Sequence, residues 1–221
     1  AGFGGEARSS ALPVASLKIV QDHGNVEIMR GCPNGCRFCH AGMISRPVRI
    51  REPGDIEAEV DRLISEAGHR EVTLASLSSA DYAGLPALLR RLNDRYAGRG
   101  VSFSVPSLRV ESVGLDMFAA LSAVRRSGLT FAVETPGPLR QRGLNKEVPA
   151  DRTIEILREA RARGWRSAKF YFMVGLPLPG SEREADEIIE LLEHTGRESG
   201  MFLNVNVATF IPKPHTPFQW A

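Results

Sequence analysis

The chain has 221 residues and a formal net charge of +2, and 43% of its residues are hydrophobic while 24% are charged. This composition is ordinary for a globular protein with a substantial core, and the charge is too small to indicate nucleic-acid or membrane binding by itself. The longest apolar runs, such as residues 170–176, are much shorter than the roughly 20 residues of a membrane helix, and no charged-then-apolar leader opens the chain. We therefore expect a soluble cytoplasmic protein that does not enter membranes.

The first residues of the chain are rich in Gly and Ser, which predicts a loose segment over residues 1–24 and one domain over residues 25–221. The chain begins at Ala1 without a methionine and stops at Ala221, directly after a Pro-rich segment. We therefore expect the core of a longer polypeptide, whose other domains select the substrate.

Extended and amphipathic patterns alternate along the remaining chain. Strands are expected at Val26–Met29, Val72–Leu77, Val101–Val105, Leu129–Val133, Ala168–Val174 and Phe202–Phe210. Helices are expected between them at about Asp55–Ala67, Tyr82–Tyr96, Leu115–Arg126, Ala150–Arg163 and Glu182–His194. Glycines follow the first four of these helices and supply the left-handed turn with which helices often end.

Six strands separated by five helices predict an α/β fold with parallel strands. Two architectures fit this order: an open doubly wound sheet and a partial barrel of six βα units. The Gly-x-Gly-x-x-Gly turn of a dinucleotide-binding sheet is missing after the first strand. We therefore favour the partial, TIM-like (β/α)6 barrel, in which chemistry takes place on the loops that leave the carboxyl ends of the strands.

All three cysteines of the chain stand in the loop after the first expected strand, as Cys32, Cys36 and Cys39. Thiols gathered in one loop indicate a metal site in a reducing compartment rather than a disulfide framework. Iron–sulfur cubes usually take four thiolates, so three thiolates leave one iron open to another ligand. The alternative is a structural zinc site that also uses His40, because thiolate and imidazole ligands together close a tetrahedral site.

The Cys-x3-Cys-x2-Cys spacing in the first loop of a six-unit βα barrel resembles the radical S-adenosylmethionine (SAM) superfamily. The resemblance covers the chain from about Val26 to Phe218. More narrowly, the chain is similar to uncharacterised bacterial members that often carry a cobalamin-binding-type region before the barrel. The segments that carry this narrower likeness are residues 30–32, 41–43, 46–49, 76–79, 106–110, 145–146, 171–173 and 210–220.

The resemblance implies that Cys32, Cys36 and Cys39 hold a [4Fe–4S] cluster whose fourth iron binds the amino and carboxylate groups of S-adenosylmethionine. One electron then cleaves this cofactor to methionine and a 5′-deoxyadenosyl radical, which attacks an unidentified substrate. An electron donor such as flavodoxin or ferredoxin is implied, and so is cobalamin through an upstream domain. The alternatives are cobalamin-linked methyl transfer or rearrangement, methylthio transfer to RNA, which needs a second cluster, and a zinc-stapled binding module without catalysis.

The resemblance also assigns cofactor contacts to side chains of the expected mouth. It places Phe38 against the adenine, Glu134 near the ribose or methionine, and Lys146 at the cofactor's carboxylate, with Arg140 and Arg142 as substitutes. Burial of Glu134 without a partner would be costly, so an ion pair with Arg109 or Lys146 is the alternative for that residue.

Two strand-exit loops depart from the usual pattern of the superfamily. Ser78 and Ser79 stand where many relatives carry Gly-Gly-Glu, which binds the methionyl amine, and Asp81 is the nearby acid. Gly175 lets the backbone approach the adenine side of the cofactor, or it serves only a tight turn. Two additional residues, Leu178 and Pro179, lengthen the loop that follows Gly175.

Several other cations and imidazoles fall in or near the expected mouth. Arg46, Arg49 and Arg51 follow the cysteine loop and would either meet an anionic group of the substrate or form a solvated face. Arg109 ends a strand and is expected to face the mouth. We expect His40 and His215 to be hydrogen-bonded loop residues, and we assign neither of them to catalysis.

Overall fold

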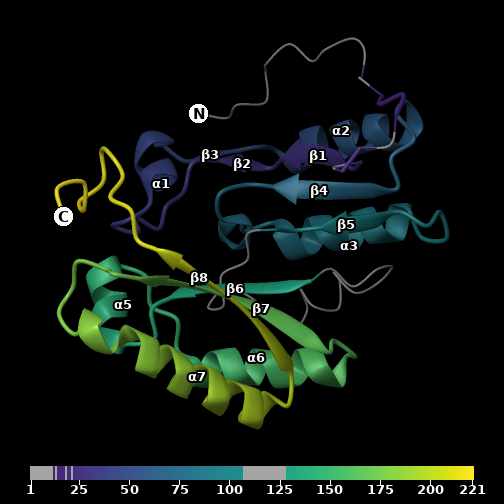
Figure 1. The fold of residues 1–221 in the computed structure, drawn as a ribbon. Helices are drawn as coiled ribbons and strands as arrows, with labels where there is room; N and C mark the ends of the chain where they lie inside the picture. The colour runs from purple at the N-terminus through teal and green to yellow at the C-terminus, as the bar shows by residue number, and fades with distance from the viewer. Residues whose placement is uncertain (1–11, 13, 18, 21, 107–127) are drawn as a thin grey trace. The chain divides into compact units, whose positions relative to one another are not determined.

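The computed structural model describes residues 12, 14–17, 19–20, 22–106 and 128–221 (Figure 1). The chain divides into two compact units. The first unit comprises residues 1–31, 47–107 and 116–127, and the second comprises residues 32–46, 108–115 and 128–221. The expected helix Leu115–Arg126, Arg109 and most of the expected loose segment lie outside the described residues.

The first unit contains a parallel sheet of order β1–β4–β5, formed by β1 (Gly24–Glu27), β4 (Glu71–Ala75) and β5 (Ser102–Ser104). The helices α2 (Pro53–Ser65) and α3 (Leu85–Arg95) each bury one apolar face. Their buried residues recur at helical spacing and are Ile56, Val60, Leu63 and Ile64 of α2 and Leu85, Leu88, Leu89 and Leu92 of α3. Tyr96, at the end of α3, donates a hydrogen bond to the Asp61 carboxylate of α2.

The first unit also contains a short antiparallel pair that the sequence did not predict, β2 (Met29–Arg30) with β3 (Arg49–Ile50). Arg51 follows this pair and is buried. Its Nη1 lies 2.7 Å from Glu59 Oε2 and donates to the carbonyl of Glu27 at 3.0 Å. Arg51 therefore contributes to the packing of the first unit, not to a solvated face.

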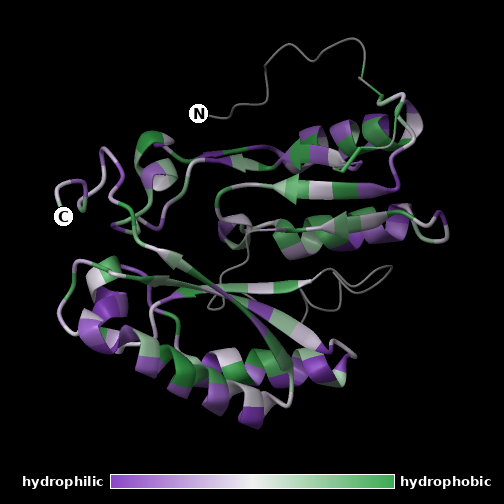
Figure 2. Ribbon diagram, in the orientation of Figure 1, coloured by the Kyte–Doolittle hydropathy of each residue, from purple (hydrophilic) through white to green (hydrophobic). Residues whose placement is uncertain are grey.

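The second unit contains a parallel sheet of order β6–β7–β8, formed by β6 (Leu129–Glu134), β7 (Ser167–Val174) and β8 (Phe202–Thr209). Two helices, α6 (Ala150–Ala162) and α7 (Glu184–Ser199), run side by side next to this sheet (Figure 1). Phe131, Phe170 and Phe172 form the aromatic centre of the core, with ring centroids 5.4 and 6.3 Å apart. Hydrophobic and hydrophilic residues alternate along α6 and α7 (Figure 2), and α6 buries Ile154, Ile156 and Leu157.

Two short helices of the second unit were not predicted, α1 (His40–Ile44) and α5 (Pro138–Leu144). Both span fewer than eight residues, too few to show a helical period in the sequence. The last long helix, α7, continues to Ser199, beyond its expected end at His194, and stops at Gly200 with φ +61°. Three of the glycines that were expected to end helices, Gly68, Gly98 and Gly164, have φ values of +75°, +75° and +94°.

The expected alternation of parallel strands and helices is confirmed. In both units every strand pair of the main sheet is parallel. The ends of each predicted strand lie within two residues of the observed ends. Over the described ranges the strands form no closed barrel. No helix among these residues is both long and apolar enough to cross a membrane.

Candidate functional site

The three cysteines lie in one loop of the second unit, where they are half-buried and form no disulfide. Cys39 precedes α1, and its sulfur accepts a hydrogen bond from the Gly42 N–H at 3.4 Å. The sulfur of Cys32 accepts one from the side-chain amide of Asn34 at 3.5 Å.

The C-terminal end of α5 fixes the shape of this loop from outside. The Asn145 side-chain amide donates to the carbonyls of Asn34 and Gly35 at 2.9 and 3.2 Å. The Arg37 backbone N–H donates to the Leu144 carbonyl at 2.9 Å, and Arg37 Nη1 donates to the last carbonyls of α5 at 2.9 and 2.6 Å. Asn145 caps α5 with φ +55°. Gly is the most common residue at such a left-handed helix end, and Asn is also found there.

Asn145 was recognised in the sequence only as part of a motif, and its hold on the cysteine loop was missed. The bonds from its side chain span 110 and 111 residues of chain, so no local pattern reveals them. The available signal was the residue type, since an Asn directly after a short polar segment is a common left-handed helix end.

The loop supplies three thiolates, from Cys32, Cys36 and Cys39, one fewer than a closed iron–sulfur cube takes. A tetrahedral zinc site needs four ligands around one centre, whereas each thiolate of a cube binds a different iron. Among the residues that the structure describes, no three His, Cys, Asp or Glu side chains are grouped closely enough to hold one metal ion.

Glu134 ends β6 in a strained conformation. The register between β6 and β7 shifts between Ala132 and Glu134, and Glu134 has φ +68°, a left-handed value that is uncommon outside Gly. Such a bulge changes the direction of a side chain, and strain of this kind is concentrated at functional sites. Glu134 is also buried. The strand end therefore holds a carboxylate inside the protein at the expense of an unfavourable backbone.

The partner of this carboxylate is Lys146. The Lys146 Nζ lies 2.7 Å from Glu134 Oε1, and the two side chains are only 12% and 11% exposed. The same ammonium lies 5.8 Å from the centroid of the Phe38 ring, within range of a cation–π contact. The structure thus brings three predicted contact residues, Phe38, Glu134 and Lys146, together beside the cysteine loop, and it shows the ion pair that was the alternative expectation for Glu134.

Gly175 directly follows β7, and an acidic side chain holds it in place. Its φ is +76°, and its N–H donates to Glu184 Oε2 at 2.7 Å. Glu184 is 2% exposed, and its Oε1 has no hydrogen-bond partner among the described residues. No atom lies within 4 Å of the position of a Cβ on Gly175, so the positive φ and not crowding requires the glycine.

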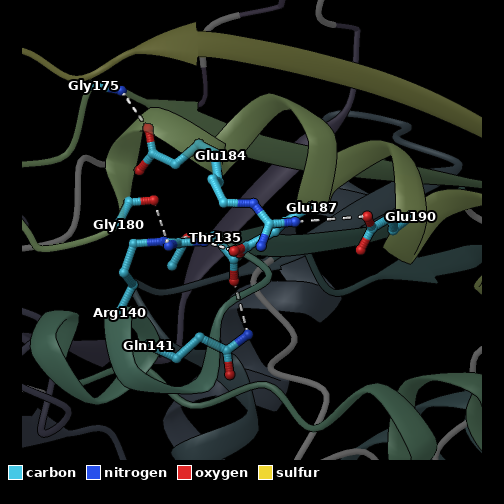
Figure 3. A network of polar contacts seen from close by, with 9 residues as sticks. Thr135, Arg140, Gln141, Gly175, Gly180, Glu184, Glu187 and Glu190 are labelled. Atoms are coloured by element: carbon cyan, nitrogen blue, oxygen red, sulfur yellow. Dashed lines mark hydrogen bonds and ion pairs between the residues drawn. The ribbon is translucent and has the colours of Figure 1, made fainter.

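The loop that follows Gly175 is tied to α5 by Arg140 (Figure 3). Arg140 is buried and donates to Thr135 Oγ1 at 3.0 Å and to the Gly180 carbonyl at 2.8 Å, and it pairs with Glu187 of α7. These bonds use its donors, so Arg140 is not available as a substitute for Lys146. The additional residue Leu178 fits against Gly143 of α5, where a Cβ would lie 2.9 Å from its side chain.

Ser78 and Ser79 lie in the first unit, after β4, and both are buried. The Ser78 hydroxyl donates to Asp81 Oδ2 at 2.6 Å, and the Ser79 and Ser76 hydroxyls are 2.9 Å apart. These bonds hold the short 3-10 helix Ser79–Asp81. Both serine hydroxyls therefore already serve the turn that presents the Asp81 carboxylate.

The two mouth histidines contact each other in the second unit. The rings of His40 and His215 are stacked with centroids 6.2 Å apart. His215 has φ +62°, and its backbone N–H donates to Gln219 Oε1 at 3.0 Å. This contact joins the segment after β8 to the start of α1.

Comparison with known proteins identifies the family. The model of the Radical SAM superfamily matches residues 26–197. The uncharacterized protein MJ0966 of Methanocaldococcus jannaschii is 30% identical over 194 residues, which are 88% of this chain and 42% of that protein. The tRNA-2-methylthio-N(6)-dimethylallyladenosine synthase of Bifidobacterium longum is 26% identical over 226 residues, covering 94% of this chain and 43% of that protein. The chain thus spans about two fifths of the length of these relatives.

The fold also resembles solved radical SAM structures. The methyltransferase TsrM from Kitasatospora setae has a TM-score of 0.72 at 15% identity, over 89% of this chain and 38% of that chain. Coproporphyrinogen III oxidase (HemN) from Escherichia coli has a TM-score of 0.58 at 18% identity, over 89% of this chain and 45% of that chain. These similarities confirm the expected α/β core with parallel strands. The matched region includes the cysteine loop, and the chain belongs to the Radical SAM superfamily.

Proposed function

We propose that this chain is the catalytic core of a radical SAM enzyme in which Cys32, Cys36 and Cys39 hold a [4Fe–4S] cluster with one iron open to S-adenosylmethionine. The observation that carries the proposal is the cysteine loop, in which Cys32, Cys36 and Cys39 form no disulfide and Asn145 and Arg37 hold the backbone in place. When bound, the cluster and S-adenosylmethionine supply a reductive cleavage that gives methionine and a 5′-deoxyadenosyl radical.

The polar group beside the loop supports a cofactor site. We assign Lys146 to the carboxylate of S-adenosylmethionine and Glu134 to a hydroxyl or ammonium group of the same cofactor. In the absence of a ligand each charge neutralises the other, which keeps two buried charges paired. Phe38 lies under the Lys146 ammonium and offers a ring face to the adenine. The strained Glu134 backbone supports this assignment, because a purely structural ion pair needs no left-handed residue.

The remaining proposed cofactor contacts are those of Gly175 and of the loop that contains Ser78 and Ser79. We assign the backbone of Gly175 to the adenine side, where Glu184 fixes the turn. We assign the methionyl amine to the loop of Ser78 and Ser79. Because both hydroxyls already bond within that loop, Asp81 is the group in it that suits an ammonium ion.

The setting of the core follows from its chemistry. Reduced thiols and a one-electron step require a reducing compartment and a donor, so we place the protein in the cytoplasm with a flavodoxin or ferredoxin as electron source. We further propose that residues 25–221 act as one core within a longer protein, in which an upstream domain would bring cobalamin. The solved TsrM structure has cobalamin and a [4Fe–4S] cluster bound, and this supports the latter proposal.

Methylthio transfer is a second candidate, because the Bifidobacterium relative is a tRNA methylthio synthase. Such a reaction needs a second cluster as a sulfur source, and the 221 residues hold no cysteine outside the loop. We therefore favour SAM cleavage as the activity of these residues, and assign sulfur insertion only to a longer protein that supplies further ligands.

The proposal is tested by anaerobic reconstitution with iron and sulfide, followed by dithionite and S-adenosylmethionine. Wild-type protein should hold about four irons per chain and release 5′-deoxyadenosine. Cys36→Ala leaves two thiolates and should hold no stable cube. A fully loaded protein that releases no 5′-deoxyadenosine would indicate a cluster carrier, and stoichiometric zinc without iron would contradict the enzyme assignment.

A further inference from the structure

Three exposed arginines border the cysteine loop in the second unit, and we call them the arginine rim: Arg37, Arg46 and Arg142. Arg37 stands between two of the cysteines, and its guanidinium is fixed by two carbonyls at the end of α5. Arg142 lies in the last turn of that helix. Arg46 follows α1, and its Nη2 would be 3.1 Å from a Cβ on Gly35 of the loop. Arg37 and Arg46 therefore place positive charge at the cysteine loop, and Arg142 adds a third arginine on the helix end that holds this loop.

The charge of the rim is not neutralised within the described ranges, where no carboxylate pairs with any of the three side chains. Several exposed or half-buried arginines elsewhere are paired instead. Arg62, Arg91 and Arg158, on α2, α3 and α6, each pair with a glutamate. A group of unpaired exposed cations gives a local positive field that attracts an anionic partner. Because Arg37 is already fixed, little side-chain entropy is lost when a partner binds to it.

We propose that the arginine rim is the docking surface for an acidic protein electron donor, an inference that rests on the proposed function. The reduced flavin or iron–sulfur centre of the donor loses one electron, and the cluster in the cysteine loop gains it. No bond is made or broken in this step. Electron transfer slows steeply with distance, so the donor must bind next to the loop, where the rim lies. The same charges would steer the acidic donor toward this loop.

Nucleic acid fits the rim less well. A surface that follows a phosphate backbone presents an extended basic stripe or face. The rim has only three cations around one loop, and the whole chain carries a formal charge of +2. We therefore favour an acidic protein patch over nucleic acid as the partner of the rim.

The test uses reconstituted protein and two electron sources, reduced flavodoxin and the small molecule 5-deazaflavin reduced by light. The variant is Arg46→Glu with Arg142→Glu, which spares the carbonyl bonds of Arg37. Release of 5′-deoxyadenosine driven by flavodoxin should fall about tenfold or more, since steering changes association rates by about 10 to 10³-fold. The rate with deazaflavin and the iron content should stay within about twofold of wild type, and the flavodoxin-driven rate of the wild type alone should fall steeply with salt.

A matched control changes the same charge elsewhere in the second unit. Arg166, before β7, and Arg197, in α7, are both exposed, so Arg166→Glu with Arg197→Glu should leave both rates unchanged. If the rim variant loads iron poorly, Arg46→Gln with Arg142→Gln removes the charges without reversing them and should give a smaller fall of the same kind.

Three results would overturn the docking surface. They are an unchanged flavodoxin-driven rate in the rim variant, an equal fall with both electron sources, and a loss of tRNA binding while the flavodoxin-driven rate is kept. Failure of the proposed function looks different, because wild-type protein would then release no 5′-deoxyadenosine with either source.

Discussion

Glu134 allows the strained backbone and the cofactor contact to be tested separately. Replacement by Ala removes the carboxylate but keeps a side chain in the left-handed conformation, with φ +68°. Replacement by Gly removes the carboxylate and also relieves that backbone, because Gly adopts positive φ without a Cβ clash. The two variants therefore differ in stability but not in the loss of a cofactor contact.

The structure sets the expected magnitudes. Both variants leave the Lys146 ammonium, at 12% side-chain exposure, without the carboxylate 2.7 Å away. Removing one partner of a buried pair costs about 3 kcal/mol. A left-handed non-glycine residue costs about 1–2 kcal/mol, and the backbone entropy of Gly offsets about 0.5–1 kcal/mol of the relief. We therefore expect the Gly variant to be about 1 kcal/mol more stable than the Ala variant, and both to be less stable than wild type.

Urea unfolding gives the two stabilities, and anaerobic calorimetry gives the affinity for S-adenosylmethionine. Both variants should hold as much iron as wild type and bind S-adenosylmethionine about tenfold or more weakly, a loss typical of one charged hydrogen bond. Equal stabilities of the two variants would show that the backbone of Glu134 is not strained. Affinities equal to that of wild type would remove Glu134 from the cofactor site.

Three further predictions follow from the same contacts. Lys146→Ala should weaken binding of S-adenosylmethionine without loss of iron, and unchanged affinity in calorimetry would remove Lys146 from the site. Asn145→Ala loses two hydrogen bonds to the cysteine loop, worth about 1 kcal/mol each, and should accelerate iron loss to a chelator; Asn145→Gly restores only the backbone and should lose iron nearly as fast. Burial, and then the hydrogen bond to Asp61, raise the pKa of Tyr96 from 10.0 to about 12. The folded protein keeps this proton after the unfolded chain has lost it, so stability should fall as the pH rises from 10 to 12, and the fall should be smaller in Tyr96→Phe when both proteins are unfolded in urea.

Periodicity revealed the long elements because each buries one face. The apolar positions of α2 and the aromatic and β-branched run of β7 are visible in the sequence, and both elements were placed within about two residues. The seven-residue helix α5 has no such signal. It nevertheless supplies the carbonyls and the Asn145 amide that hold the cysteine loop, and these bonds join parts of the chain more than 100 residues apart.

In the candidate site, too, some features could be predicted from the sequence and others could not. The metal-binding role of the three cysteines was predicted from their spacing. Because a buried Glu134 needs a partner, Lys146 was named as one of two possible ion-pair partners. The bulge and the positive φ at Glu134 were not predictable, because the sequence of β6 reads as a regular strand and Glu rarely adopts that conformation. The resemblance also gave no signal of the role of Glu184, which holds the turn at Gly175 through one buried bond.

Electron paramagnetic resonance of the reduced, reconstituted protein is the most direct test of the cysteine loop as the site of a cluster with one open iron. We predict the signal of a reduced [4Fe–4S] cluster, which changes when S-adenosylmethionine is added because the cofactor binds the iron that no thiolate holds. The signal should be lost in Cys36→Ala. A cluster signal that stays the same at saturating S-adenosylmethionine would show that a protein side chain already occupies the fourth iron, and would contradict the proposed chemistry.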